Sequence, residues 1–162
     1  MKRLVLVFSM LILLLTAVVG CQGPSSYALQ SHIDSLQTRL DSAYTPGIGE
    51  IMNGIVQPHH YKLWLAGQNE NWTLAEYERH QLAGGFKRII KYHKNSPEAT
   101  ALPMVYPEMD AIEKAIREKD AVAFKSHFVL LTQTCNTCHQ ATEYEFNLIV
   151  VPSVPAYGNQ HF

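Results

Sequence analysis

The sequence predicts an all-α fold: a four-helix bundle with an extra N-terminal amphipathic helix and an extended C-terminal tail. Two observations lead to this prediction. Apolar residues recur at three- and four-residue spacings in successive stretches, which is the pattern of helices that bury one face. Turn and cap residues separate these stretches. With 162 residues, the chain has room for one modest domain and not for two large ones.

The N-terminus has the order of a secretory signal. Met1-Lys2-Arg3 is followed by a mostly apolar run over residues 4–19 and then by Gly20-Cys21. The ending Val18-Val19-Gly20-Cys21 resembles a bacterial lipobox, which implies that residues 1–20 are a lipoprotein signal peptide and that Cys21 is lipidated. A transmembrane helix is the alternative, because the apolar run is near the lower length limit for spanning a bilayer.

Export and a lipid anchor restrict where the protein works and what it binds. We expect it to be held by Cys21 on a membrane facing the periplasm or the cell exterior. Removal of the signal peptide leaves 11 basic and 14 acidic residues, a net charge of about −3. Nucleic acid is therefore not an expected partner. With Cys21 lipidated, only Cys135 and Cys138 remain for other chemistry.

The segment 21–46 is predicted to form a lipid tether and an amphipathic helix. The helix is expected over residues 26–43, where apolar residues follow helical spacing, and Thr45-Pro46-Gly47 ends it. Two roles stay open for its apolar face. It could form a homodimer, or it could fold back onto the bundle.

The bundle is predicted over residues 47–146, and its first helix runs from Gly47 to near Gly67. One stripe on this helix contains Ile48, Met52, Ile55, His59, Leu63 and Ala66. Pro58 lies inside the helix, where it removes a backbone hydrogen bond. We therefore expect a kink between Gly54 and Pro58.

Three further helices follow. Thr73 and Glu76 form a capping-box pattern for a second helix that continues toward Tyr92. A third helix is expected from about Pro107 to Lys119. Asp120 is the predicted N-cap of the fourth helix, which should end near Glu145. Residues 147–162 contain two prolines and are expected to be an extended tail.

The strongest chemical signal is the motif Cys135-Asn136-Thr137-Cys138-His139. Covalent attachment of haem requires two thiols spaced to meet its two vinyl groups and an imidazole directly after the second thiol. On a helix these three side chains share one face. The motif therefore predicts one haem c, attached at Cys135 and Cys138, with His139 as the proximal iron ligand.

Two alternatives for the motif use no haem. Half of a zinc site would need a second pair of Cys or His ligands at matching spacing, and the sequence contains no second CxxC. A redox-active CxxC of the thioredoxin type is expected at a helix start after a strand, in an α/β chain. A lipid-anchored helical scaffold with a redox CxxC stays open as the non-haem function.

The other face of the iron has two candidate ligands. Met52 is the first, because it lies on the stripe of a helix that should run antiparallel to the fourth helix. His59 is the second, since an inward-facing histidine must be hydrogen-bonded or bind something. His60 lies one residue off the stripe and is expected at the boundary with solvent. An iron with neither ligand is also possible.

A four-helix bundle with CxxCH on its last helix resembles the class II cytochromes c, which include cytochrome c prime. The likeness covers about residues 47–146 and implies that Cys135, Cys138 and His139 hold the haem. In that class, a methionine on the first helix accompanies electron transfer, and an apolar residue leaves the iron able to bind gases such as nitric oxide or carbon monoxide. The sequences around Trp64 and at the C-terminus also resemble a set of uncharacterised bacterial haem proteins.

The leading hypothesis is a monohaem electron carrier that exchanges one electron with redox partner proteins outside the cytoplasm. The second is a five-coordinate, gas-binding haem protein. Hydrolytic or transferase catalysis has no support in the sequence. No nucleophile and base occur at the spacing of a known catalytic motif, and no phosphate-binding glycine loop is present. We therefore expect a protein that is not an enzyme.

Overall fold

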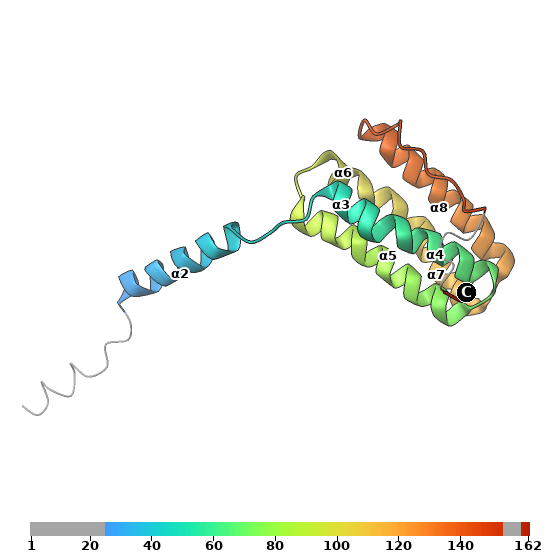
Figure 1. The fold of residues 1–162 in the computed structure, drawn as a ribbon, viewed down its shortest axis with the longest axis horizontal. Helices are drawn as coiled ribbons and strands as arrows, with labels where there is room; N and C mark the ends of the chain where they lie inside the picture. The colour runs from blue at the N-terminus through green and yellow to red at the C-terminus, as the bar shows by residue number, and fades with distance from the viewer. Residues whose placement is uncertain (1–24, 154–159) are drawn as a thin grey trace, which may run out of the picture. The chain divides into compact units, whose positions relative to one another are not determined.

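The computed structural model describes residues 25–153 and 160–162. The predicted signal peptide over residues 1–20 and the predicted lipid site Cys21 lie outside this part of the chain. The described residues form helices and no strands, which confirms the all-α class (Figure 1). The chain divides into two compact units, residues 1–44 and 45–162.

The first unit contains the helix α2, Ser26–Asp41, close to the predicted range. Ser25 caps it, because its side-chain oxygen accepts a hydrogen bond from the backbone N–H of Ala28 at 3.3 Å. Its apolar side chains are exposed: Leu29, Ile33, Leu36 and Leu40. Within the described part of the first unit, therefore, α2 builds no core of its own.

The second unit begins with one long helical run in three parts. These are α3, Ile48–Ile51, the π-helical turn η1, Met52–Val56, and α4, Gln57–Gln68. The N–H of Gln57 bonds to the carbonyl of Met52, five residues back. Where the sequence predicts a kink, the chain forms a wide turn, since Pro58 can donate no hydrogen bond and its ring would press on the carbonyl of Gly54 in a regular α-helix.

The next long helix is α5, Trp72–Tyr92. Its N-cap is Asn71, whose side chain accepts a hydrogen bond from the N–H of Leu74 at 3.2 Å. The capping box predicted at Thr73 is therefore wrong. The carboxylate of Glu76 accepts hydrogen bonds from Arg79 instead, at 2.5 and 2.7 Å.

Two short helices follow, between the segments predicted as the second and third helices of the bundle. They are α6, Pro97–Ala101, capped by Ser96, and the 3₁₀ turn η2, Leu102–Val105. The helix α7, Tyr106–Glu118, follows directly. Lys119 ends it in the left-handed conformation, with its N–H bonded to carbonyls of the last turn.

The last helix is α8, Ala121–Ala141, and its predicted N-cap is confirmed. The Asp120 side chain accepts hydrogen bonds from the N–H groups of Val122 and Ala123 at 3.0 and 2.9 Å. The helix ends before Glu145, because Glu143 has a positive φ of 65° and starts a turn. Residues 147–153 have no regular secondary structure, as predicted for the start of the tail.

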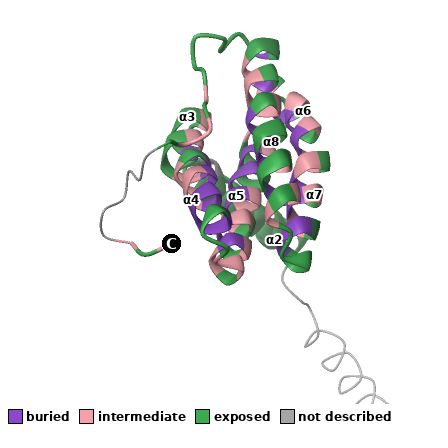
Figure 2. Cartoon of the chain, turned by 90° about the vertical axis from the view of Figure 1, so that its right-hand side faces the viewer, coloured by how far each residue is buried: buried purple, intermediate pink, exposed green. Residues whose placement is uncertain are grey.

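The long helices of the second unit pack in a closed circuit: α4 on α5, α5 on α7, α7 on α8 and α8 on α4. Their buried residues face one another (Figure 2). The core includes Leu63, Leu82, Phe86, Ile89, Ile112, Phe124, Phe128 and Leu131. At Gly67 the chain allows close contact, since an added Cβ would lie 2.1 Å from the ring of Phe124. The apolar stretches that predicted these helices thus supply the core of α5, α7 and α8, although Tyr77, on the expected apolar side of α5, is 55% exposed.

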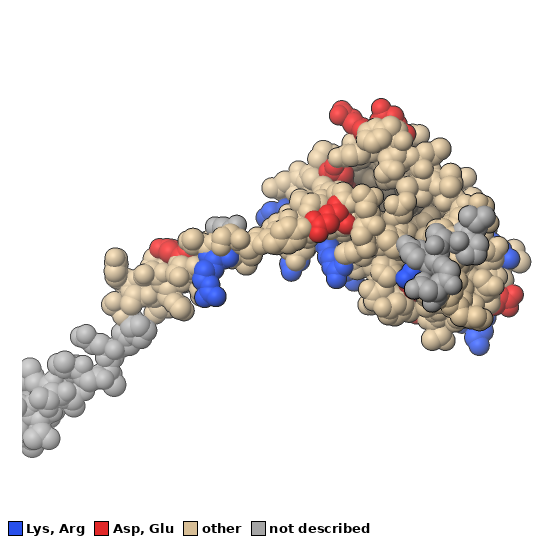
Figure 3. All heavy atoms as spheres, viewed as in Figure 1, with Lys and Arg blue, Asp and Glu red and all other residues tan. Residues whose placement is uncertain are grey.

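No helix in residues 25–153 or 160–162 combines the length and the apolar composition needed to cross a membrane. The charged side chains of one face are drawn in Figure 3, where acidic groups lie over the C-terminal end of α8. Lysine and arginine side chains on that face lie over other parts of the molecule.

Candidate functional site

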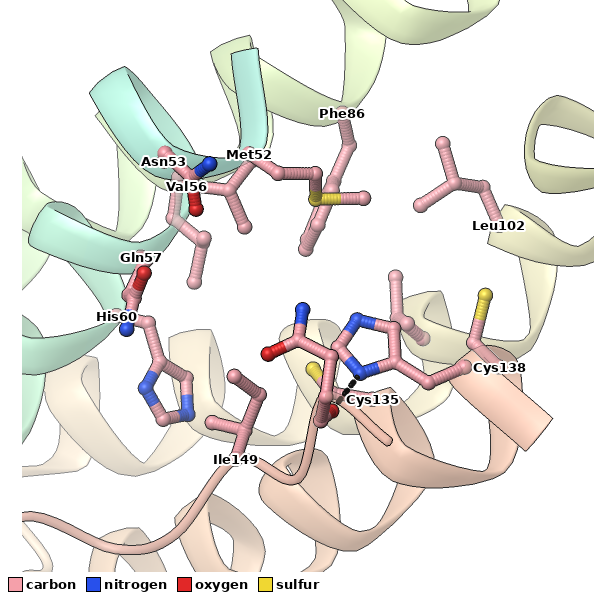
Figure 4. Close-up of a pocket in the computed structure, with 14 residues that line it drawn as sticks. Met52, Asn53, Val56, Gln57, His60, Phe86, Leu102, Cys135, Cys138 and Ile149 are labelled. Atoms are coloured by element: carbon pink, nitrogen blue, oxygen red, sulfur yellow. Dashed lines mark hydrogen bonds between the residues drawn. The ribbon is translucent and has the colours of Figure 1, made fainter. Parts of the chain in front are cut away.

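The CxxCH motif opens onto a pocket in the second unit (Figure 4). The pocket contains about 590 Å³ of space free of protein atoms, part of it open to solvent. Cofactor sites in proteins are mostly apolar. The lining side chains come from η1, α4, α5, η2, α8 and the tail. They are Met52, Asn53, Val56, Gln57, His60, Leu82, Phe86, Leu102, Val105, Cys135, Cys138, His139, Asn147 and Ile149.

Both cysteines of the motif are free thiols that line this pocket. They lie in the C-terminal half of α8, one helical turn apart. Burial raises the pKa of Cys135 to about 12, and burial together with nearby Glu98 raises the pKa of Cys138. Both sulfurs are therefore protonated at neutral pH. They are thiols in an apolar pocket rather than reactive thiolates.

His139 lines the same pocket and makes one hydrogen bond with its ring. Its Nδ1 lies 2.6 Å from the carbonyl oxygen of Asn147. Because a carbonyl can only accept, Nδ1 carries the proton and Nε2 keeps its lone pair. Ligand histidines in metalloproteins commonly have this arrangement, in which a backbone carbonyl fixes the tautomer and the orientation of the ring.

Asn136, inside the motif, holds the tail against α8. Its Nδ2 donates to the carbonyl of Ile149 and its Oδ1 accepts from the N–H of Ile149, both at 2.8 Å. The Asn136 amide thus pairs with Ile149 much as a neighbouring strand would. It fixes the segment that contains Asn147, the hydrogen-bond acceptor of His139, and it places the Ile149 side chain in the pocket.

Met52 faces the motif from the other side of the pocket. It is the first residue of the π-helical turn, and its thioether points into the space that Phe86, Leu102 and Cys138 also border (Figure 4). The structure therefore brings together four of the residues predicted from the sequence, namely Met52, Cys135, Cys138 and His139. π-Helical turns are frequent at functional sites.

His59, the second predicted distal candidate, is not among the residues that line the pocket. Its Nδ1 lies 2.5 Å from Oε2 of Glu78 on α5, and that carboxylate is almost fully buried. The pair links α4 to α5. A buried carboxylate requires a polar partner, and in the described structure His59 is that partner for Glu78.

His60, expected at the boundary with solvent, is buried instead and lines the pocket. Its Nε2 lies 3.0 Å from Oγ1 of Thr132, and its ring packs at a tilt of 35° against Phe128, with centroids 4.5 Å apart. Thr132 donates its own proton to the carbonyl of Phe128, so it accepts from Nε2–H of His60. Burial lowers the pKa of His60 to about 4, which keeps the ring neutral.

The π-helical turn explains why His60 takes the place expected for His59. In a regular α-helix, seven residues make almost two full turns, so Met52 and His59 would share a face. The wide turn over Met52–Val56 takes up one extra residue. Met52 therefore shares its face with the residue after His59. The only sequence signal for this shift is Pro58.

These residues fit a covalently attached haem. Two thiols and an imidazole nitrogen with a free lone pair line one apolar pocket, with a thioether opposite. Among the described residues, no group of three or more His, Cys, Asp or Glu side chains is arranged to hold a metal ion. A haem iron receives four nitrogen ligands from the porphyrin, so the protein has to provide only axial ligands.

Comparisons of this chain with protein-family models, with curated proteins and with solved structures found no match.

Proposed function

We propose that this chain is a monohaem c-type cytochrome that carries single electrons between partner proteins. One observation supports this most directly: the free thiols of Cys135 and Cys138 and the ring of His139, whose Nδ1 is held by Asn147, all line one apolar pocket. The packing of the helical run 48–68 with α5, α7 and α8 is consistent with a four-helix bundle like that of the class II cytochromes c. The chain is proposed not to be an enzyme.

Each of the three motif residues has a distinct role in this proposal. Cys135 and Cys138 would form thioethers, in which each sulfur bonds to one carbon of a vinyl group and its hydrogen goes to the other carbon. His139 would bind the iron through Nε2, with its ring held by Asn147. When bound, haem supplies a one-electron ferrous–ferric couple.

Met52 is the proposed distal ligand, because its thioether lies in the pocket on the side opposite α8. A Met–His pair raises the reduction potential relative to two histidines. Phe86, Leu102 and Val105 are buried apolar side chains on the walls of this region. A filled sixth position suits an electron carrier, whereas a gas-binding protein requires an open one.

The anchor and the location belong to the same proposal. Cys21 would hold the mature chain to a membrane, and residues 1–20 would direct its export. A thiol–disulfide function for the CxxC is less consistent with the fold. Such motifs work at the N-terminus of a helix, whereas this one lies in the C-terminal half of α8.

Mass spectrometry and absorption spectroscopy of the full chain, produced in a host that attaches haem c, test the proposal. We expect the denatured protein to keep the mass of one haem, and the reduced protein to show sharp α and β bands that carbon monoxide leaves in place. Cys135→Ala/Cys138→Ala should lose the haem mass, whereas Cys21→Ser should keep it. A chain without a Soret band would exclude the cytochrome, and a broad spectrum that shifts with carbon monoxide would favour gas binding.

A further inference from the structure

The start of the tail has two different sides. Asn147 and Ile149 line the pocket, and Val151 packs against the core. Three neighbouring apolar residues face outward: Phe146 is 80%, Leu148 68% and Val150 67% exposed. Phe146 lies in a turn closed by a hydrogen bond of 2.9 Å from the N–H of Asn147 to the carbonyl of Tyr144. Residues 148–151 then alternate between exposed and half-buried, as in an extended chain, and the hydrogen bonds of Asn136 to Ile149 fix this register.

The outward side chains form an exposed apolar surface beside the pocket. Tyr144, which is 42% exposed, joins them, because its ring lies 5.8 Å from that of Phe146. We call Tyr144, Phe146, Leu148 and Val150 the tail patch. Single exposed apolar residues are ordinary, but a run of four next to a pocket is typical of an interaction surface.

The charge around the tail patch is negative. Glu143 and Glu145 flank Tyr144 and are exposed, and acidic side chains are visible over this end of α8 (Figure 3). After Lys125 the sequence contains no further lysine or arginine. The patch therefore has an acidic rim with no basic residue from its own segment to neutralise it.

We propose that the tail patch is the docking surface for the redox partner, and that this partner presents an apolar patch rimmed by lysine or arginine. The proposal rests on the proposed function. It follows from three features together: an apolar centre, an acidic rim, and a position one residue away from side chains that line the haem pocket. Transfer moves one electron from the reduced iron to the oxidised partner and forms no bond.

The acidic rim favours a basic partner protein over a second copy of the chain and over an anionic membrane. A second copy of the chain would bring the same glutamates against each other, and like charges at close distance repel. An anionic membrane surface would be repelled in the same way. A basic protein is attracted, and its association rate falls as salt screens the charges. Electron-transfer complexes have small, transient interfaces.

Stopped-flow kinetics with the full-length, haem-loaded protein test the proposal. The probe is a small, lysine-rich c-type cytochrome in its oxidised form, with the same protein after lysine acetylation as its control. We expect the second-order rate with the basic probe to fall about tenfold between low and high salt. The acetylated probe should react more slowly and show little salt dependence.

Variants separate the patch from its rim. Phe146→Ser/Leu148→Ser should slow transfer, whereas Val122→Ser should leave the rate unchanged, because Val122 is 81% exposed but lies at the N-terminal end of α8, away from the tail. Glu143→Lys/Glu145→Lys should reverse the salt dependence. Its control is Glu118→Lys, an exposed acid at the end of α7. All four variants should keep the wild-type absorption spectrum.

The outcomes distinguish this proposal from the proposed function. A protein without haem absorption refutes the function before any kinetics is measured. A normal spectrum with equal rates for Phe146→Ser/Leu148→Ser and Val122→Ser refutes the docking surface alone. Loss of dimers in sedimentation velocity, or of flotation with anionic vesicles, on Phe146→Ser/Leu148→Ser would assign the patch to self-association or to a membrane and overturn the proposal.

Discussion

The Nδ1–H group of His139 donates a hydrogen bond of 2.6 Å to the carbonyl oxygen of Asn147. This contact connects the motif to a segment that follows the end of α8. Asn136 holds that segment by two hydrogen bonds to Ile149. The orientation of the proposed iron ligand therefore depends on a residue between the two cysteines, which is usually regarded as a spacer.

Replacement of Asn136 should loosen the tail without removing a proposed ligand. In Asn136→Ala, two partly buried hydrogen bonds are lost, and we expect local opening to become easier by about 1–2 kcal/mol. Hydrogen exchange at the Ile149 amide should be correspondingly faster. A weaker hydrogen bond to His139 makes the imidazole less basic, so the reduction potential should rise. Thr137→Ala is the control, because the hydroxyl of Thr137 donates within its own helix, to the carbonyl of Gln133.

Replacement of Met52 should open the sixth position of the iron. Met52→Leu keeps the volume but removes the thioether, so we expect a high-spin spectrum that responds to carbon monoxide and a lower reduction potential. Met104→Leu is the matched control, because Met104 packs against the core outside the pocket. An unchanged low-spin spectrum in Met52→Leu would show that another side chain, with His60 the nearest candidate in the pocket, fills the position.

Two adjacent glycines of α5 should respond in opposite directions to alanine. A Cβ at Gly85 would lie 2.8 Å from Val56 in the π-helical turn, whereas a Cβ at Gly84 meets nothing within 4 Å. Gly84→Ala should stabilise the fold by about 0.5–1 kcal/mol through helix propensity. Gly85→Ala should destabilise it by about 1–3 kcal/mol because of the clash. Urea unfolding of the two variants checks the sign, and equal stabilities would contradict the tight contact.

The free energy of unfolding should depend on the protonation of His60. Its pKa is lowered from 6.5 to about 4 in the folded state, so the unfolded chain binds a proton first as the pH falls. The contribution of neutral His60 is present above pH 6.5 and is lost between pH 6.5 and 4, in total about 3 kcal/mol. His60→Gln should unfold with a shallower pH dependence over this interval. Parallel pH profiles for the two proteins would contradict the burial of a neutral ring.

Much of the fold follows from local rules in the sequence. The apolar stripes of α5, α7 and α8 are core in the structure, and Asp120 caps α8 as its side chain predicts. The cap of α5 was misassigned because Asn71 and Thr73 are both good cap residues two positions apart. Asn71 is the N-cap in the structure, so Glu76 is not at the capping-box position and pairs with Arg79.

Within the site, the covalent motif was predictable and its surroundings were not. CxxCH is a local pattern, so Cys135, Cys138 and His139 could be named from spacing alone. The tail contact could not, because it joins Asn136 to a residue 13 positions later by a side chain that mimics a strand. The sequence also could not predict that His60, rather than His59, lines the pocket. A stripe drawn on a helix assumes a constant number of residues per turn, and the π-helical turn breaks that assumption.

The wide turn over Met52–Val56 makes the number of residues as important as their identity. Deletion of Gly54, which has no neighbour within 4 Å of its Cβ position, would let this segment return to a regular α-helix. Met52 and His60 would then lie seven positions apart in a regular helix, the spacing at which two side chains share a face, so both would still point into the pocket. The same deletion in a regular stretch of α4 would instead rotate the side chains on its two sides by about 100° relative to each other. The π-helical turn thus marks a position where the chain can lose a residue without changing which histidine faces the pocket.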